Sequence, residues 1–542
     1  MCQRKFRFKF GFILFFVLWV QLKLYPQENT VGLISNRISD QGYILFNPLS
    51  NKTTYLINRQ GEQVHSWTSS YVPGMTVYLH EDGMLFRAGR VTDDTYINSG
   101  GAGGIIEQFN WEGEVIWQYR YSSPLVRQHH DFEILPNGNI LILAWEKKTK
   151  EQAIAAGRDP SSLGTDQLWP DHLVEVKPMG ESGGAIIWEW HVWDHLVQNY
   201  DPSKDNFGDV SNPGLIDLNH YSNKLADWIH GNSLEYNEEL DQIMISSRGF
   251  NELWIIDHST TIEEARSDSG GRSGKGGNLL WRWGNPSTCR KEGSQLLFGQ
   301  HGVYWESVPN TGESRIYIYN NGNGRRPEIF STIDFVDIKY SDITGYPLTA
   351  AGYFAPNDFT STFSPEDSLS IYAPLFSNVQ KMKDDHLLVC VGPRGTFIEY
   401  DNTGEEVWKY INPVTESGRI LSQGELIGDH QASINSVFSI QYYSQSFPGF
   451  DGKLLTSLGV IEGEMVTGIN EEENNYSISP NPVKTHFFIQ GDVQTIRITN
   501  LNGQTVKTIL SPGDKINVSD LEPGMYICLI NQAFTLKLIV TK

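Results

Sequence analysis

The chain repeats one pattern of hydrophobic and polar positions six times, as short runs of alternating apolar and polar residues separated by polar turns that contain glycine. Alternation with a period of two is typical of β-strands that bury one face. In five copies a strand, a turn and a second strand with tryptophan near its end follow one another, at residues 55–67, 106–119, 181–192, 276–286 and 397–410. The copy at 315–335 has the same rhythm without the tryptophan. The pattern predicts β-hairpins whose final aromatic side chain packs between sheets.

A glycine precedes the tryptophan by four residues in four of these copies, in the pairs Gly113/Trp117, Gly184/Trp188, Gly277/Trp281 and Gly404/Trp408. Another pair of strand-like runs precedes each hairpin, so residues 40–462 divide into six units of four expected strands. One such unit cannot bury both of its faces alone. We therefore expect an all-β fold, a six-bladed β-propeller built by radial stacking of the units. A pair of β-sandwiches is the alternative, which a single sustained repeat disfavours.

Three long polar segments interrupt the even spacing of the repeats, at residues 147–172, 192–227 and 331–370. They are rich in aspartate, asparagine, proline and glycine. Long loops in a compact fold usually cover or build a functional site. We expect these loops to do so here.

The first residues have the pattern of an export signal. Four basic residues between Arg4 and Lys9 precede an apolar run, Phe10–Val20, that is too short to span a bilayer comfortably. Residues 1–27 are therefore predicted to be a cleaved signal peptide. No later segment is long and apolar enough for a stable membrane span.

The texture changes after about residue 462. Residues 463–475 form an acidic, asparagine-rich linker, and residues 476–542 alternate in short strands that predict a small C-terminal β-sandwich. The tail, from SISPNPVKTHFFI to LKLIVTK, resembles the C-terminal sorting domain of the type IX secretion system of Bacteroidetes. The resemblance implies that the type IX machinery is a partner and that the protein is secreted or held at the cell surface. It also implies that the tail is removed or replaced by an anchor.

Charge and cysteine content exclude several classes of function. The chain has 64 acidic against 42 basic residues, a net charge of −22, and such a surface repels nucleic acid. It contains four cysteines and no CxxC pair, which argues against zinc-ribbon and thioredoxin folds. Cys390 lies in the apolar run HLLVCVG, so a buried free thiol is expected there rather than a bridge to Cys289.

Histidines recur at the start of strands in three consecutive repeats. His129 and His130 precede DFEILPNGN, His230 precedes GNSLEY, and His301 precedes GVYW. Arg248 follows His230 by 18 residues, at the end of the next strand of that repeat. A single histidine or arginine at such a place is more often structural. Because the inner strands of a propeller converge on one axis, the recurrence predicts one shared site.

Two other histidine positions are given structural roles. His191 and His195 form an H-x-x-x-H that lacks the glutamate of a zincin motif and follows a strand-like run, so they are predicted to mark a strand end entering a loop rather than a metal site. His430 is interpreted as a loop histidine, with a place in the central channel as the alternative.

Four segments, 129–139, 227–234, 246–261 and 279–305, resemble the bacterial PAPS-independent arylsulfate sulfotransferase family in sequence and order. The resemblance implies a six-bladed propeller with its site in the central channel. It also implies ping-pong transfer of a sulfuryl group from an aryl sulfate donor to a phenolic acceptor through a sulfohistidine. His301 would be the nucleophile, and His230, Arg248 and His130 would be the other catalytic residues. His129 and Asn232 would be substrate-binding residues.

The expected chemistry requires neither a metal nor a cofactor, because imidazole is a competent nucleophile at neutral pH. The sequence also contains no G-x-x-x-x-G-K loop, which argues against a nucleotide sulfate donor. Two other functions are possible for such a chain. One is a non-catalytic secreted propeller that binds a glycan or a protein. The other is a quinone-dependent dehydrogenase, which the count of six repeats rather than eight disfavours.

Overall fold

The computed structural model describes residues 29–542 except 40, 94–95, 221–223, 426–433, 465–475, 491–492, 501–503, 511, 514 and 532–533. The predicted signal peptide, most of the predicted linker and His430 therefore lie outside the described residues. The chain divides into two compact units, Met1–Met465 and Val466–Lys542, and each is described by itself.

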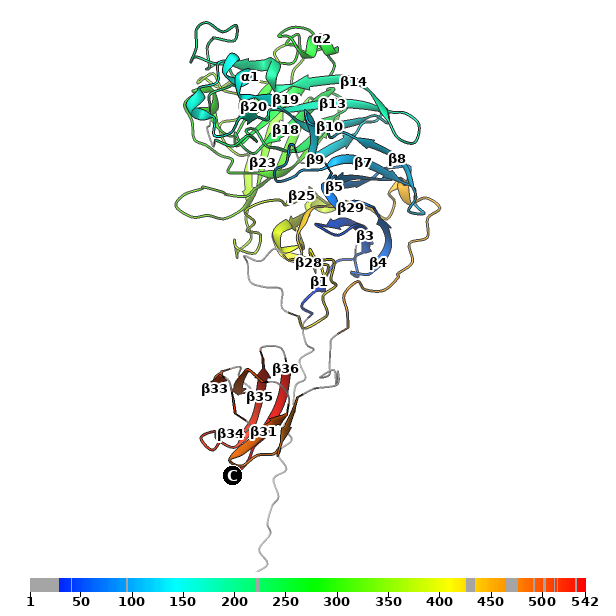
Figure 1. Ribbon diagram of the computed structural model, residues 1–542. Helices are drawn as coiled ribbons and strands as arrows, with labels where there is room; N and C mark the ends of the chain where they lie inside the picture. The colour runs from blue at the N-terminus through cyan, green and yellow to red at the C-terminus, as the bar shows by residue number, and fades with distance from the viewer. Residues whose placement is uncertain are drawn as a thin grey trace, which may run out of the picture. The chain divides into compact units, whose positions relative to one another are not determined.

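The described part of the first unit contains six antiparallel sheets of four or five strands, which we number in chain order (Figure 1). The first sheet consists of β29 (Val437–Tyr443), β2 (Tyr43–Pro48), β3 (Thr53–Asn58) and β4 (Gln63–Thr68). The second consists of β5 (Pro73–Leu79), β6 (Leu85–Arg90), β7 (Gly104–Phe109) and β8 (Val115–Arg120). The third consists of β9 (Val126–Ile134), β10 (Ile140–Glu146), β13 (Asp171–Pro178) and β14 (Gly184–His191).

The remaining three sheets follow the same order of strands. The fourth consists of β17 (Gly231–Asn237), β18 (Gln242–Ser247), β19 (Glu252–Asp257) and β20 (Trp281–Trp283). The fifth consists of β21 (His301–Val308), β22 (Glu313–Asn320), β23 (Thr332–Lys339) and β24 (Ser361–Phe363). The sixth consists of β25 (Asn378–Lys381), β26 (Leu387–Val391), β27 (Thr396–Tyr400), β28 (Glu406–Ile411) and β1 (Gly32–Asn36).

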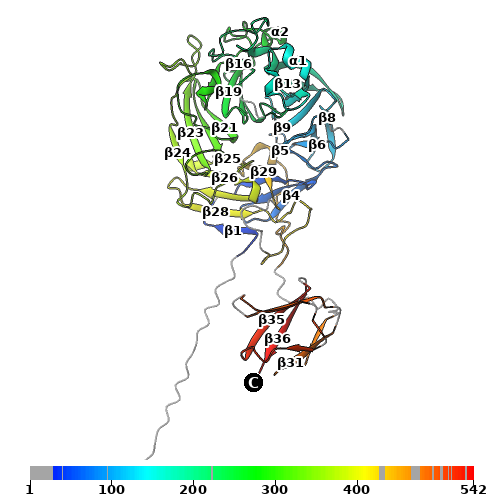
Figure 2. The same ribbon diagram turned by 60° about the vertical axis from the view of Figure 1, so that its left-hand side comes forward.

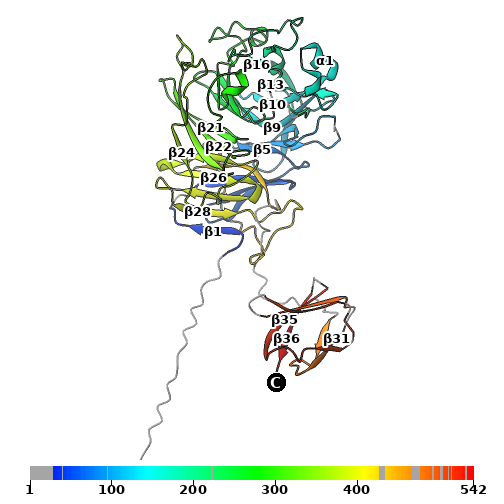
Figure 3. The ribbon, with the colours of Figure 1, turned by 90° about the vertical axis from the view of Figure 1, so that its left-hand side faces the viewer.

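The first sheet joins the two ends of the unit. Its first strand, β29, comes from the C-terminal end and pairs with β2, with Tyr43 opposite Tyr443. The prediction of four local strands in the first repeat is therefore wrong, because only three of them are local. The first strands β5, β9, β17, β21, β25 and β29 contact one another in this order, and β29 also contacts β5. Figure 2 shows β5, β9, β21, β25 and β29 toward the middle of the unit, and Figure 3 shows β5, β9 and β21 there from another side.

The repeated tryptophans lie in the last of the predicted strands of their sheets and are nearly fully buried. Each indole N–H donates to the connection between the third and fourth strands of the following sheet. The bonds run from Trp67 to Asn110 O (3.0 Å), Trp117 to Gly183 O (2.8 Å), Trp188 to Thr260 Oγ1 (3.0 Å), Trp281 to Ala355 O (2.9 Å) and Trp408 to Arg59 O (2.8 Å). The repeated tryptophan thus forms a hydrogen bond between each of these sheets and the next. In the fifth sheet Phe363 lies in this strand and packs at a tilt against Tyr400, and its side chain has no hydrogen-bond donor.

His258, which follows β19, carries an ion pair between the third and fourth sheets. Its Nδ1 lies 2.7 Å from Asp241 and its Nε2 lies 3.1 Å from Glu175. Burial alone would lower the pKa of His258, but the hydrogen bonds to Asp241 and Glu175 raise it to about 9. The imidazolium form is therefore part of the fold at neutral pH.

Replacing His258 with glutamine should lower the free energy of unfolding by up to about 3 kcal/mol at pH 6. Because the pKa of His258 is raised in the folded state, this contribution is complete below the pKa of the unfolded chain, about 6.5, and is lost as the pH rises through 9. Urea unfolding of wild type and variant between pH 6 and 9.5 measures the difference. A gap that does not change with pH would contradict the ion-pair assignment.

Short elements occupy the long loops. The first loop holds β11 (Lys148–Thr149), α1 (Lys150–Ala155) and β12 (Gln167–Leu168), and the second holds the parallel pair β15 (Leu196–Val197) and β16 (Ile216–Asp217). A further helix, α2 (Ile262–Ala265), precedes β20. Among the described residues no helix has the length and apolarity to cross a membrane.

The second unit contains two sheets around one apolar cluster. One sheet consists of β30 (Ser477–Ser479), β31 (His486–Gln490) and β34 (Lys515–Asn517). The other consists of β33 (Thr505–Leu510), β32 (Thr495–Asn500), β35 (Gly524–Ile530) and β36 (Phe534–Val540). Phe487, Ile498 and Leu538 belong to the cluster that both sheets bury.

The cysteines of the described chain, Cys289, Cys390 and Cys528, are buried free thiols. The prediction of a free thiol at Cys390 is therefore confirmed. Cys390 is buried because it lies in strand β26, all of whose residues are buried.

Candidate functional site

The structure brings the predicted histidines together at one end of the first strands. His301 is the first residue of β21, and His230 directly precedes β17. His129 and His130 lie inside β9, which begins at Val126, so the prediction that they precede the strand is wrong. Because β9, β17 and β21 contact one another, side chains from three sheets meet at this place.

His130 and His230 face each other. Their rings are 4.7 Å apart at an angle of 70°. Both residues adopt the left-handed backbone region, with φ of 49° for His130 and 54° for His230. Non-glycine residues in this region are strained, and strain of this kind gathers at functional sites.

Gly101 allows the ring of His130 to lie against the chain. The His130 amide donates to the Gly101 carbonyl over 2.8 Å, and a Cβ on Gly101 would lie 2.0 Å from Cε1 of His130. Gly101 also has a φ of 85°, which side chains other than glycine rarely adopt. The glycine thus fixes where the imidazole of His130 lies.

Replacing Gly101 with alanine should lower the catalytic efficiency about 10- to 100-fold, because the methyl group displaces the His130 ring from its place beside His230. The matched control is Gly138→Ala, since Gly138 has a similar φ of 79° but nothing within 4 Å of its Cβ position. Steady-state kinetics and a thermal melt of both variants separate the two effects. Equal losses of activity in both variants would show that backbone strain alone is responsible.

Two neutral acceptors fix the orientation of His301. Its Nδ1 lies 3.0 Å from the carbonyl oxygen of Gly299 and 2.8 Å from Oδ1 of Asn321. The amide of Asn321 is itself oriented, because its Nδ2 donates to the carbonyls of Ala373 and Phe376. Nδ1 of His301 therefore carries the proton, and Nε2 keeps its lone pair.

His301 is neutral at physiological pH. Its side chain is almost completely buried, and this burial, with the nearby charge of Arg248, lowers its pKa to about 3, although the Asn321 hydrogen bond opposes the change. A neutral imidazole with an available Nε2 is a nucleophile. The same desolvation, with the charges of His230 and His129, lowers the pKa of His130 well below its usual value.

A carboxylate, in contrast, orients His230. Oδ2 of Asp227 lies 2.6 Å from Nδ1 of His230, and Oδ1 of Asp227 accepts from the indole of Trp145 over 3.1 Å. Burial would raise the pKa of Asp227, but the charge and hydrogen bond of His230 lower it. Asp227 is therefore an ionised carboxylate in contact with Nδ1.

Arg248 and His230 line a cavity of about 380 Å³. The backbone N–H of Arg248 donates to the His230 carbonyl over 3.2 Å, so the turn after β18 holds the two residues side by side. The cavity also reaches Gly299, whose carbonyl binds His301, and Asn323. An arginine and a histidine on a small cavity, with the ring of His130 4.7 Å from that of His230, suit a compact anion.

His129 and Asn232 lie behind these residues. His129 stacks on Trp145 at 3.9 Å and its Nδ1 lies 2.9 Å from Nδ1 of His130. Asn232 is fully buried and its amide donates to the carbonyl of Gln300 over 2.7 Å, next to His301. His129 thus contacts His130, and Asn232 contacts the residue before His301. Direct contact of either residue with a substrate stays a prediction.

The sequence reasoning did not assign Asp227, Asn321 and Gly101 to the site. Asp227 stood inside the segment DWIHGNSL, three residues before His230, which is a signal that could have found it. Asn321 and Gly101 come from distant turns, and only the folded chain shows their contacts with His301 and His130.

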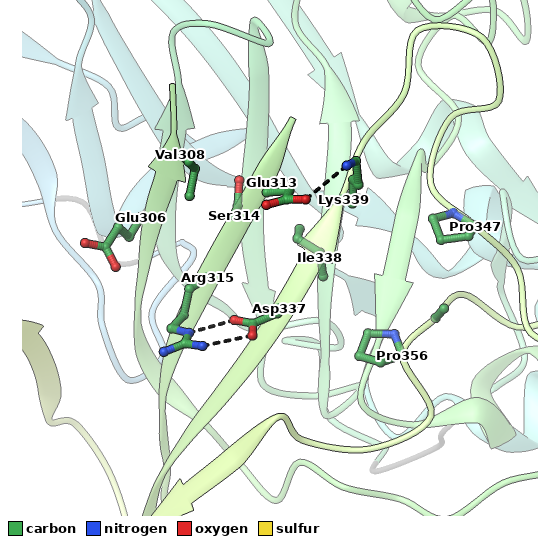
Figure 4. A pocket seen from close by; sticks show the side chains of 11 residues that line it. Glu306, Val308, Glu313, Ser314, Arg315, Asp337, Ile338, Lys339, Pro347 and Pro356 are labelled. Carbon is green, nitrogen blue, oxygen red and sulfur yellow. Dashed lines mark hydrogen bonds and ion pairs between the residues drawn. The ribbon is translucent and has the colours of Figure 1, made fainter. Parts of the chain in front are cut away.

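A larger cavity, of about 590 Å³, lies against β21, β22 and β23 of the fifth sheet (Figure 4). Four of its charged side chains form two ion pairs, Arg315 with Asp337 and Lys339 with Glu313. The predicted loop 331–370 contributes to this cavity through Pro347 and Pro356 rather than to the histidine site. The loop 192–227 does reach that site, through Asp227 and its neighbour Leu225.

The histidine pair His191 and His195 is used by the fold. His191 ends β14, as the sequence predicts, and His195 bonds to the carbonyl of Ala265 (2.9 Å) and to Asn278 (3.0 Å). In the described parts of the chain no group of three or more His, Cys, Asp or Glu side chains could hold a metal ion.

The sequence matches two family models. The arylsulfotransferase (ASST) model matches residues 46–425, and the secretion system C-terminal sorting domain matches residues 477–541. No curated protein matches the chain significantly.

Two solved structures show distant similarity. A protein of unknown function from Bacteroides caccae is 11% identical, with 74% of this chain and 98% of that chain covered and a TM-score of 0.38. A periplasmic gluconolactonase from Pseudomonas aeruginosa is 8% identical, with 74% and 99% covered and a TM-score of 0.36. The identification therefore depends on the family models. The sorting domain indicates a protein that is secreted or displayed at the cell surface of Bacteroidetes-like bacteria. Because the first model covers well over half of the sequence, the chain belongs to the arylsulfotransferase family.

Proposed function

We propose that the protein moves a sulfuryl group from a phenolic sulfate ester to a phenolic acceptor by a ping-pong mechanism. The sulfuryl group is carried between the two on Nε2 of His301. The observation that supports this best is the environment of His301, which is buried, neutral and fixed at Nδ1 by Gly299 and Asn321. Imidazole in this state attacks sulfur without first losing a proton.

The other residues have roles that follow from charge. Arg248 binds the sulfuryl oxygens, because its guanidinium offers several donors in a plane that fits an oxyanion. His230 lines the same cavity and assists the departing phenolate, and His130 lies against it. The donor needs no nucleotide, which agrees with a sequence that has no phosphate-binding G-x-x-x-x-G-K loop.

The proposal includes the architecture that the sequence predicts. The six sheets form the blades of a propeller over residues 40–462, with the site where the first strands converge. The repeated tryptophan bonds and the pairing of β29 with β2 support this assignment. Residues 476–542 form a small β-sandwich for type IX export after residues 463–475, and residues 1–27 are the signal peptide.

The function is tested with purified protein and p-nitrophenyl sulfate. We expect nitrophenol release that increases when phenol is added, together with formation of phenyl sulfate. Release that ignores the acceptor would instead indicate a hydrolase, and no release with any aryl sulfate would favour a non-catalytic binding protein. Mass spectrometry of enzyme quenched without acceptor should find one sulfuryl group on the peptide that contains His301.

A further inference from the structure

Two different groups contact the two central histidines at the same ring atom. Nδ1 of His230 faces the carboxylate of Asp227 at 2.6 Å, whereas Nδ1 of His301 faces the neutral amide oxygen of Asn321 at 2.8 Å. A carboxylate stabilises the protonated form of an imidazole, and an amide oxygen orients the ring with no such preference for charge. Both rings are therefore oriented through Nδ1, but one of them faces a negative charge and the other a neutral acceptor.

We propose that Asp227 and Asn321 are positioning residues that divide two roles between these histidines, so that Nε2 of His230 gives a proton to the departing aryl oxygen while Nε2 of His301 attacks sulfur. This inference rests on the proposed function. Pairs of groups whose surroundings separate their protonation states are how enzymes assign an acid and a nucleophile at one pH.

The surroundings agree with this division. Asp227 has 6% of its side chain exposed and is held on its other oxygen by Trp145, so its charge stays against His230. The titratable and charged groups around His230 are Asp227 on its own turn, Asp171 on β13, His129 and His130 on β9, Arg248 after β18 and His301 on β21. Of the two carboxylates, Asp227 hydrogen-bonds to the imidazole of His230, whereas Asp171 accepts from the Gly231 amide.

The groups that face His301 are all cations or neutral. They are Arg248, His230 and His130, and Asn321 supplies a neutral acceptor. Burial and the charges of Arg248 and His230 lower the pKa of His301 to about 3, although the Asn321 hydrogen bond opposes the change, so the attacking form is present across the physiological range. A carboxylate in place of Asn321 would work against this.

The steps balance as follows. The lone pair on Nε2 of His301 forms a bond to sulfur, the bond from sulfur to the aryl oxygen breaks, and its electron pair goes to that oxygen. The aryl oxygen takes the proton from Nε2 of His230, and His230 becomes neutral. The other proton of His230 stays on Nδ1 and remains hydrogen-bonded to Asp227. In the second step the acceptor phenol gives its proton to Nε2 of His230 and its oxygen forms a bond to sulfur. The bond from sulfur to Nε2 of His301 breaks, and its electron pair returns to Nε2, which restores the neutral imidazole.

The test compares donors with leaving groups of different acidity. A phenolate with a pKa of about 10, as for tyrosine, needs a proton as it departs, and p-nitrophenolate needs one far less. Replacing Asp227 with asparagine keeps the shape but removes the charge. We expect kcat/KM to fall about 100-fold for phenyl sulfate and less than about 10-fold for p-nitrophenyl sulfate.

The Asn321→Asp variant tests the other half of the proposal. A carboxylate at Nδ1 raises the pKa of His301, so activity should be lost toward acidic pH and recover as the pH rises, by the same factor for both donors. The matched control is Asp171→Asn, because Asp171 is a buried carboxylate that accepts from the Gly231 amide over 2.6 Å beside the same turn. Any loss in this control should not depend on the leaving group.

Each variant tests the role of one positioning residue. Equal loss for both donors in Asp227→Asn would overturn the role of Asp227 as a positioning residue for an acid, and an unchanged pH profile in Asn321→Asp would overturn the role of Asn321. If Asp227→Asn does not fold, as judged by circular dichroism, the pH profile of Asn321→Asp still decides. A wild-type protein that is inactive toward both donors would instead remove the proposed function itself.

Discussion

Replacing His301 with alanine should abolish sulfuryl transfer, with a loss of at least about 10³-fold in kcat. The variant loses the one buried imidazole whose Nδ1 is fixed by Gly299 and Asn321 and whose pKa lies far below physiological pH. Nitrophenol release in the presence of phenol measures the loss, and the sulfuryl adduct should also disappear from the quenched protein.

The control for His301→Ala is His195→Ala, which removes another buried imidazole that bonds to Ala265 and Asn278. This control should lose stability but keep the adduct on His301. Substantial activity in His301→Ala, or an adduct on a different histidine, would contradict the assignment of the nucleophile.

Replacing Arg248 with alanine should lower kcat about 10²- to 10³-fold, because Arg248 supplies the permanent positive charge beside the cavity where the sulfuryl oxygens gain charge. Arg248→Lys keeps the charge but loses the planar set of donors, so it should fall between wild type and alanine. Steady-state kinetics with p-nitrophenyl sulfate separates kcat from KM.

Arg315→Ala is the matched control for Arg248. Arg315 is an exposed arginine that pairs with Asp337 at the other cavity, so its removal should leave the kinetics unchanged. A loss confined to KM in Arg248→Ala would show that the arginine only recruits the donor and does not stabilise the transition state.

The sequence predicts the hairpins well, because each hairpin pairs strands that follow one another along the chain. The alternation and the Gly-x-x-x-Trp spacing identify the last strands, and Trp117 and Trp281 lie in β8 and β20. The pairing of β29 with β2 and of β1 with β28 is not written in any repeat, because these partners lie hundreds of residues apart. Pairing between distant segments depends on the assembled sheets, which no local pattern contains.

The candidate site divides in the same way. His130, His230 and His301 can be predicted from their recurrence at the same place in successive repeats, and Arg248 from its position at the end of the strand that follows His230 in one of them. Asn321 cannot, since its role depends on an amide that is turned by carbonyls at positions 373 and 376.

The contact between the fifth and sixth sheets differs from the other contacts between neighbouring sheets. Five neighbouring pairs of sheets are joined by an indole, but the fifth and sixth are not, because Phe363 has no N–H. Across this contact Asn321 donates to Ala373 and Phe376, and Tyr319 bonds to Ile371. The side chain of Asn321 thus has two functions in the structure, because it accepts a hydrogen bond from His301 and also links the fifth sheet to the segment that leads into the sixth. A change in the contact between these two sheets would therefore also change the orientation of His301.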